Sequence, residues 1–211
     1  MGVEWQRQRS GLGQRRGKLD ESIATWKELI DINPIMAVTA YGEIATMRLQ
    51  QGRLNEAAQA FQQAIQYNEK AEFKIDVAGI HLDLAFLLKD LKQSEQSREH
   101  LGKAIEGFRK TLTKDPKSIQ TLSRLGVALA EVGRFSEATE YLQQAADMNS
   151  FEVESHLSLA KALLTQQRYD EAIAALKKAI GSFSRIEDEK AVDRLQKYLR
   201  FIENDKNANK K

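Results

Sequence analysis

Small side chains recur along the chain at a fixed spacing, and apolar residues surround them at helical intervals. Within each set of three, the spacing is 12 and then 7 residues. The step between sets is 35, 40, 41 and 34 residues, so the joints vary while the interior does not. This pattern is typical of a helical repeat. The sets are Ser10, Ser22 and Leu29; Ala45, Ala57 and Ala64; Ala85, Ser97 and Ala104; Gly126, Ala138 and Ala145; Ala160, Ala172 and Ala179.

Each set predicts two helices of about 12 to 14 residues joined by a short turn. Leu122, Leu125 and Leu129 share one helix face, and Phe135 and Leu142 share a face of the next helix. A small residue in the middle of each helix lets the two axes approach at the close end of about 8 to 10 Å. Glycine at the turn takes the left-handed conformation that ends a helix, and two of the four turns lack it. The turns carry Gly52-Arg53, Lys92-Gln93, Gly133-Arg134 and Gln167-Arg168.

The same positions match a known repeat pattern. They include Leu125-Gly126, Ala138 and Ala145, then Ala57, Phe61 and Ala64, and the run from Arg168 to Ile173. On these residues the chain resembles the tetratricopeptide repeat (TPR) family, including its extended variants of about 40 residues. The resemblance implies an all-α fold, a right-handed superhelical solenoid of antiparallel helix hairpins.

The pattern also divides the chain into segments. We expect a basic, flexible segment or degenerate first helix at 1–18, the TPR-like solenoid at 19–184, a C-terminal capping helix at 185–204 and a disordered tail at 205–211. The units of the solenoid are expected near 19–36, 38–77, 78–118, 119–152 and 153–184. In the capping helix, one apolar face would cover the last unit and the charged face would meet solvent. That apolar face consists of Ile186, Val192, Leu195, Leu199 and Ile202.

Extra residues lie on both sides of the third unit, within 66–77 and 105–118. Ile105, Phe108 and Leu112 continue the apolar stripe, so the second insertion predicts a longer helix that ends at Asp115-Pro116. We expect Asp115 to be the N-cap of the following helix, with Pro116 in its first turn.

The first unit has no recognisable opening helix. Over 3–16, the four positions that ought to pack hold Gln6, Arg9, Ser10 and Gly13, so we expect no standard helix there. The next apolar stripe would then lack a cover on one side. We therefore predict an open N-terminal edge at Ile23, Trp26 and Ile30 that docks a partner, an upstream segment or a second copy in a homodimer.

The net charge and its distribution along the chain limit the classes of partner that the protein can bind. The chain has 211 residues and a net charge of +2, but residues 1–18 hold five basic residues and one Glu, or +4, which leaves 2 − 4 = −2 for 19–211. Such a body lacks the broad positive field of nucleic-acid binding proteins. The longest apolar stretch, 81–91, is interrupted by charges and is shorter than the roughly 20 residues of a membrane span. We expect no nucleic-acid partner, no membrane insertion and, by default, a cytoplasmic location.

The sequence shows no strong motif for catalysis or for binding a cofactor or a metal ion. The chain has no cysteine, which excludes a thiol nucleophile and Cys-bound zinc. The run 13–19 departs from a phosphate-binding loop in its glycine spacing and in having Leu19 after Lys18. His81, His100 and His156 are expected to be three separate histidines, and the carboxylates show no acid–base pair. We expect a protein that is not an enzyme and has no cofactor or metal.

The family resemblance implies a function in protein–protein interaction. A peptide or helix of a partner protein would bind in a concave groove lined by the first helix of each hairpin. We expect no heat-shock-protein clamp, because Glu43, Asp83 and Arg124 stand where that clamp needs Lys, Asn and Arg. The alternative is a structural or assembly module, part of a larger protein, that acts through the N-terminal edge. The implied groove residues are Glu43, Thr46, Gln50, Asp83, Phe86, Gln120, Arg124, Val127, Glu131, Ser158, Lys161 and Thr165.

Overall fold

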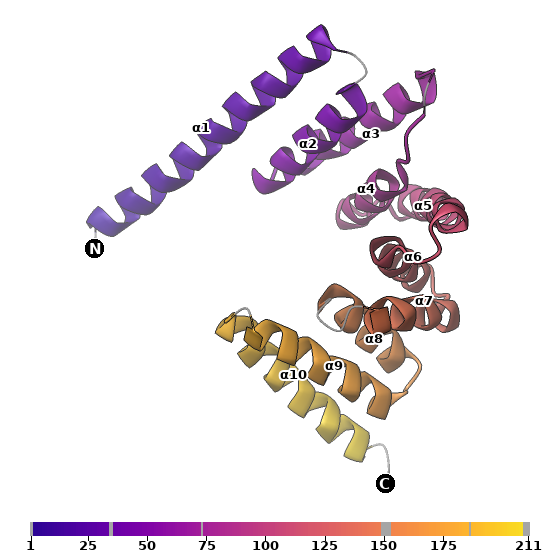
Figure 1. The fold of residues 1–211 in the computed structure, drawn as a ribbon. Helices are drawn as coiled ribbons and strands as arrows, with labels where there is room; N and C mark the ends of the chain where they lie inside the picture. Colours follow the sequence, from indigo (N-terminus) through magenta and orange to yellow (C-terminus); the bar gives the residue numbers. More distant parts are fainter. Residues whose placement is uncertain (1, 34–35, 73, 149–152, 186, 209–211) are drawn as a thin grey trace. The chain divides into compact units, whose positions relative to one another are not determined.

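The described part of the chain is built from helices joined by short connections (Figure 1). The structure is a computed structural model that describes residues 2–33, 36–72, 74–148, 153–185 and 187–208, and of residues 2–16 the backbone alone. Over these residues the predicted all-α fold of antiparallel hairpins is confirmed. The helices are α1 (Gly2–Ile32), α2 (Ala37–Gln50), α3 (Leu54–Lys70), α4 (Ala78–Asp90), α5 (Ser94–Lys114), α6 (Ile119–Glu131), α7 (Phe135–Met148), α8 (Val153–Thr165), α9 (Tyr169–Arg185) and α10 (Glu189–Ala208).

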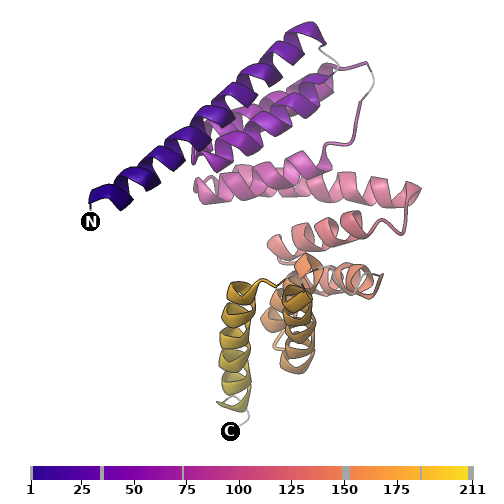
Figure 2. The same ribbon diagram turned by 60° about the vertical axis from the view of Figure 1, so that its left-hand side comes forward.

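The chain divides into two compact units, and the boundary falls within α5. Unit 1 comprises residues 1–100 and unit 2 comprises residues 101–211. In unit 1, α2 and α3 form an antiparallel hairpin, which can be followed in Figure 1 and Figure 2. In unit 2, α6 pairs with α7, α8 pairs with α9, and α10 packs on α9.

All four hairpin turns use the same backbone geometry. The second residue after the first helix has a positive φ, which is 73° at Gly52 and 83° at Gly133, but also 64° at Lys92 and 59° at Gln167. In each turn the next residue donates its backbone N–H to a carbonyl five positions back, at 2.8 to 3.0 Å. This is the bonding of a Schellman motif. The two turns without glycine therefore adopt the left-handed conformation as well.

The small residues mark the points where the two helices of a hairpin cross. Ala45 and Ala57 are both fully buried at one crossing. At the next crossing the Ser97 hydroxyl donates to the Ala85 carbonyl at 2.7 Å, so Ser97 satisfies its polar group inside the core. A Cβ on Gly126 would lie 2.5 Å from Leu142 Cγ and 3.1 Å from the Ala138 carbonyl oxygen. Small residues 12 positions apart in the sequence thus mark the place where the backbones of the two paired helices come close together.

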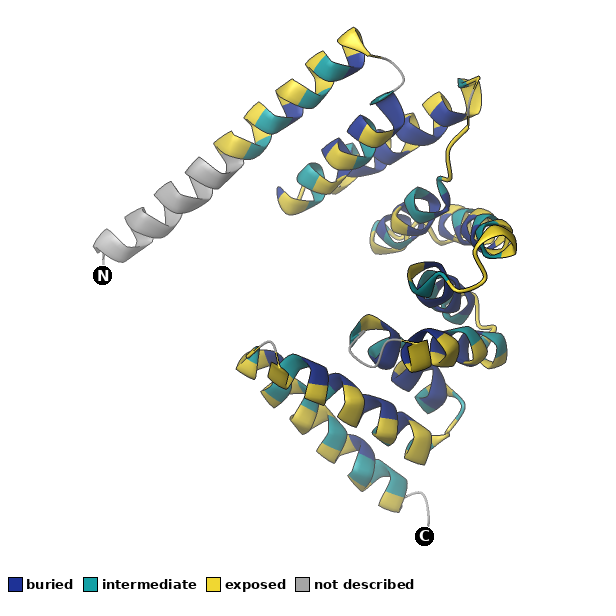
Figure 3. Cartoon of the chain, viewed as in Figure 1, coloured by how far each residue is buried: buried dark blue, intermediate teal, exposed yellow. Residues whose placement is uncertain are grey.

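The core of unit 1 joins α1 to the α2–α3 hairpin and to α4. Ile44, Phe61 and Leu88 belong to this core, and Ile23 and Ile30 of α1 pack into it. Figure 3 shows the buried residues of α2 and α3 in dark blue. Helix α1 therefore contributes the apolar stripe that its sequence predicted.

Helix α1 begins earlier than expected. Its backbone is helical from Gly2, whereas the sequence predicted a flexible segment or degenerate helix up to residue 18. The segment continues α1 and does not turn back to form a hairpin with it. The side chains of Gln6, Arg9, Ser10 and Gly13 lie outside the described residues.

The two insertions have different structures. Residues 71–72 and 74–77 form a non-helical connection, next to which the Asn68 side chain donates to the Ile75 carbonyl and accepts from its N–H. The predicted longer helix after 105 is confirmed, because α5 continues to Lys114. The predicted N-cap was wrong. Ser118, not Asp115, caps α6 by accepting from the Thr121 N–H, while Asp115 accepts from Lys117 in the preceding turn.

The C-terminal helix lies along α9. It runs from Glu189 to Ala208, so it includes residues 205–208, which the sequence assigned to a disordered tail. Contacts with α9 account for the extension, because Asp205 accepts from the Tyr169 hydroxyl and Lys206 pairs with Asp170. Ile186 and residues 209–211 of the expected cap and tail lie outside the described residues.

We predict that Gly126→Ala destabilises the protein, although alanine is the better helix former by about 1 kcal/mol. The added methyl group would overlap the fully buried Leu142, and overpacking of this kind costs about 1 to 3 kcal/mol. Gly181→Ala is the matched control, because a Cβ there meets no atom within 4 Å. Urea unfolding of both variants checks the prediction. A Gly126→Ala variant as stable as Gly181→Ala would contradict it.

The two turns in which a residue other than glycine has a positive φ, at Lys92 and Gln167, predict a second effect on stability. Gln167→Gly should raise the free energy of unfolding by about 1 kcal/mol, because a residue with a side chain in the left-handed conformation costs about 1 to 2 kcal/mol. The greater conformational entropy of glycine in the unfolded state offsets part of this gain. The reciprocal change Gly133→Gln should lower it by a similar amount. The urea midpoints of the two variants should move in opposite directions, and movement in the same direction would show that the φ angle does not set the effect.

Candidate functional site

The predicted groove residues divide between the two units. Five lie on α2 and α4 in unit 1, and seven lie on α6 and α8 in unit 2. In unit 2, the helices α6 and α8 contact one another. We call Gln120, Arg124, Val127, Glu131, Ser158, Lys161 and Thr165 the α6–α8 face.

An ion pair joins the two helices of the α6–α8 face. The Lys161 ammonium lies 3.1 Å from Glu131 Oε1, and the side chains are 76% and 11% exposed, respectively. Two positions assigned to the groove from separate repeats therefore meet on one surface. Arg124, Val127 and Ser158 are half-buried, while Gln120 and Thr165 are exposed. Among the described residues, Arg124 forms no ion pair.

The corresponding residues of unit 1 form a more acidic surface. Glu43 and Asp83 are exposed, and Phe86 is half-buried. Helices α2 and α4 are neighbours, because a Cβ on Gly42 would lie 4.0 Å from Ile80 Cδ1. Thr46 and Gln50 are exposed as well.

The N-terminal edge is less open than its sequence predicted. Ile23 and Ile30 are only 3% and 7% exposed, so neither side chain is available for docking in this structure. The reason is that both pack into the core of unit 1, even without a preceding hairpin helix. Trp26 packs against the same core and stays half-buried. Of the predicted edge, Trp26 alone keeps an accessible surface.

A polar network also fastens α1 to α2. Asp20 Oδ1 accepts from Gln51 Nε2 and from Arg48 Nη1, both at 3.0 Å, and Arg48 donates to Gln51 Oε1 at 2.7 Å. The hydrogen bond from Gln51 and the charge and hydrogen bond of Arg48 lower the pKa of Asp20 below its ordinary value of 3.8. No sequence pattern predicts this network, because its members lie 28 and 31 residues apart and are all polar.

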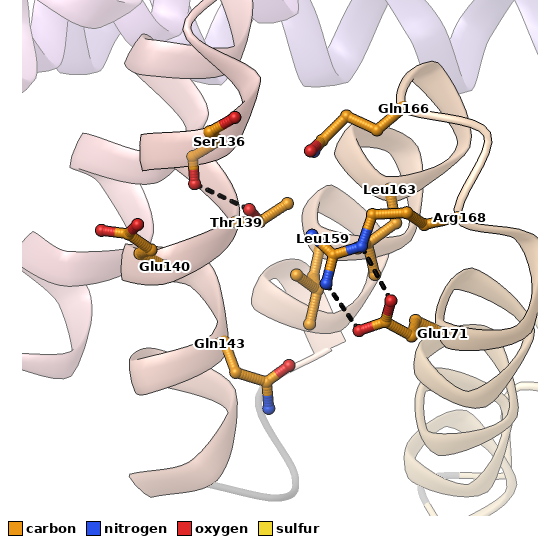
Figure 4. A pocket seen from close by; sticks show the side chains of 9 residues that line it. All are labelled: Ser136, Thr139, Glu140, Gln143, Leu159, Leu163, Gln166, Arg168 and Glu171. Carbon is orange, nitrogen blue, oxygen red and sulfur yellow. Dashed lines mark hydrogen bonds and ion pairs between the residues drawn. The ribbon is translucent and has the colours of Figure 1, made fainter.

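A separate pocket of about 410 Å³ lies between α7, α8 and the start of α9 (Figure 4). Its polar groups largely bond within the protein. Arg168 donates two hydrogen bonds to Glu171, at 2.7 and 2.6 Å, which raise the pKa of the Arg168 guanidinium and lower that of the Glu171 carboxyl. Thr139 donates to the Ser136 carbonyl, and Gln166 donates to the Phe135 carbonyl. None of the residues that line this pocket was predicted as a site.

Two of the histidines are not separate, which corrects the sequence prediction. The Nδ1 atoms of His81 and His100 lie 2.8 Å apart, and the rings stack with centroids 5.1 Å apart. One ring must donate and the other accept, so at least one of them is neutral. They come together because α4 and α5 form a hairpin, a pairing that no short motif encodes. His156 is fully buried in α8.

The described residues give little support to other kinds of site. They contain no group of three or more His, Asp or Glu side chains placed to hold a metal ion. None of their helices has both the length and the apolar character needed to cross a membrane.

Comparison with known proteins identifies the repeats. Tetratricopeptide repeat profiles match residues 76–150 and, with a second profile, residues 14–73 and 123–185. A search of curated proteins finds no match in sequence.

Several solved structures have a similar fold. TTC0263, a thermophilic TPR protein of Thermus thermophilus, is 19% identical with a TM-score of 0.60, over 88% of this chain and 91% of that one. BtubC from P. vanneervenii is 13% identical with a TM-score of 0.60, over 93% and 92%. YrrB, described as a TPR protein with an unusual peptide-binding site, is 16% identical with a TM-score of 0.55, over 86% and 84%. At these identities the likeness concerns the fold.

The Asp20 network predicts a pH dependence. Because the folded-state pKa of Asp20 is lowered, its ionised form stabilises the fold above pH 3.8, and this contribution is lost as the pH falls through the folded value. Asp20→Asn should therefore lower the melting temperature at about pH 6, and the difference from the wild type should vanish at strongly acid pH. Glu28→Gln, an exposed change on the same helix, is the control. A difference that is independent of pH would contradict the assignment.

Proposed function

The chain belongs to the tetratricopeptide repeat family, and from that premise we propose that it is a non-catalytic module that binds a peptide or helix of a partner protein on its first-helix faces. Members of this family generally mediate protein–protein interactions and are generally not catalytic. The description of YrrB as having a peptide-binding site supports the same class of ligand.

The observation that carries the proposal is the contact between Lys161 and Glu131. It supports the assignment of the α6–α8 face as one continuous surface, since the two residues come from consecutive first helices. A partner that lies across α6 and α8 would meet charged, hydroxyl and apolar groups together. The half-buried Val127 provides the apolar contact, and Ser158 provides a hydroxyl.

The charges of this face favour a carboxylate-bearing ligand. An ammonium has three N–H donors, and Glu131 takes one from Lys161, which leaves donors on an exposed side chain. Arg124 adds a guanidinium that can hold a carboxylate by two parallel hydrogen bonds. We therefore infer an acidic residue in the bound segment, beside an apolar one that contacts Val127.

The alternative, docking through the N-terminal edge, has less support. It needs Ile23, Trp26 and Ile30 together, and two of these side chains are buried. Trp26→Ala tests what is left of this alternative, in sedimentation across a concentration series. A concentration-dependent dimer that Trp26→Ala abolishes would favour the edge over the α6–α8 face.

Peptides selected by display on the full chain test the proposal. Arg124→Glu combined with Lys161→Glu should weaken binding of the selected peptides by at least about tenfold, because both changes place a negative charge against the ligand carboxylate. The matched control is Lys110→Glu with Lys178→Glu, two exposed lysines of unit 2 outside the face. Circular dichroism should show equal helix content in both variants. Selected peptides that bind both variants as tightly as the wild type would contradict the proposal.

A further inference from the structure

The outward face of α10 carries two large aromatic side chains. Phe201 is 65% exposed and Tyr198 is 46% exposed, although α10 was expected to present its charged face to solvent. Tyr198 and Phe201 are three residues apart, and Lys197 and Arg194 precede Phe201 by four and seven residues. This spacing places the four side chains along one strip of the helix. We call them, with Lys190, the α10 patch.

Helix α10 carries five basic and four acidic residues. Three of its four acidic residues bond within the protein: Glu203 lies 3.7 Å from Lys177, and Asp205 accepts from Tyr169 at 3.2 Å. Asp193 pairs with Lys197 on the helix itself, at 2.7 Å. Lys190, Arg194 and Arg200 are exposed, and among the described residues none of the three forms an ion pair. Around the two aromatic rings, Lys190, Arg194 and Lys197 outnumber Asp193, so the outward face keeps an excess of positive charge.

We propose that the α10 patch is a docking surface for an acidic protein segment that carries an apolar side chain. The apolar side chain would cover Phe201 and Tyr198, and carboxylates on either side would pair with Arg194, Lys197 and Lys190. Aromatic rings and arginine are the residue types that contribute most at protein interfaces. Complementary charge around such an anchor increases the association rate and excludes segments of the wrong sign.

Other occupants fit this surface less well. A second copy of the chain that packed α10 on α10 would bring Lys190, Arg194 and Lys197 against the same cations of its partner. Nucleic acid would need a broad positive field, whereas residues 19–211 sum to −2. A lipid surface would need a wide apolar face, whereas in the apolar stripe of α10 Ala191 and Ile202 are buried against the protein and Val192, Leu195 and Leu199 are half-buried.

The test uses the full chain and a fluorescein-labelled synthetic helix in which a Leu and Trp stripe is bordered by Glu. Fluorescence anisotropy should show binding that weakens as salt is added, and a probe with Gln in place of every Glu should not bind. Phe201→Ala should weaken binding of the acidic probe by about tenfold, as the loss of an interface anchor does. Arg194→Glu with Lys197→Glu should weaken it further.

Two controls separate this surface from the α6–α8 face and from loss of folding. The measurements are repeated in the Arg124→Glu, Lys161→Glu background, in which the α6–α8 face would repel the acidic probe, and the loss caused by Phe201→Ala should persist there. Lys178→Glu on α9 should bind the probe like the wild type. Melting curves should be unchanged in Phe201→Ala, because its ring is mostly exposed. Three results would each overturn the proposal: no binding of the acidic probe, equal binding by the patch variants, or tighter binding of an oligo-dT strand or of phosphatidylserine vesicles than of the probe.

Discussion

The close crossing of paired helices at small residues is the constraint on which this structure depends. At the α6–α7 crossing even a methyl group on Gly126 would overlap Leu142, and at the α4–α5 crossing a side-chain hydroxyl bonds directly to a backbone carbonyl. The dispersion attraction in such a contact weakens when the atoms separate by fractions of an ångström. The small residues therefore fix the distance between the helices. The four identical turns then fix the direction in which each chain segment returns.

This packing determines which side chains are left for function. In each hairpin the facing sides of the helices are buried in the core, so partners can meet only the outer strips. The α6–α8 face joins such strips through an ion pair, and the α10 patch is the strip of the last described helix. The two surfaces differ in chemistry. The first mixes charges of both signs with hydroxyl groups, and the second is cationic around two aromatic rings.

The sequence predicted the hairpins because their determinants are local and repeated. A 12-residue spacing of small residues and a helical apolar stripe encode each crossing, so Ala57, Ala138 and Ala172 could be assigned without a structure. The pairing of His81 with His100 and the Asp20–Gln51 bond could not, since each depends on side-chain directions across two helices. Exposure of Phe201 was missed for a related reason. Periodicity shows which face is mostly apolar, but not which apolar residue falls outside it.

Steric contact at the crossing sets the distance between paired helices, and a double-mutant cycle tests this contact most directly. The four proteins are the wild type, Gly126→Ala, Leu142→Ala and the double variant, with the free energy of unfolding measured for each. If the methyl group at position 126 acts through Leu142, its cost should be clearly smaller in the Leu142→Ala background, where that side chain is truncated. Strictly additive free energies would contradict this, because they would show that the tight approach of these two residues does not limit the crossing.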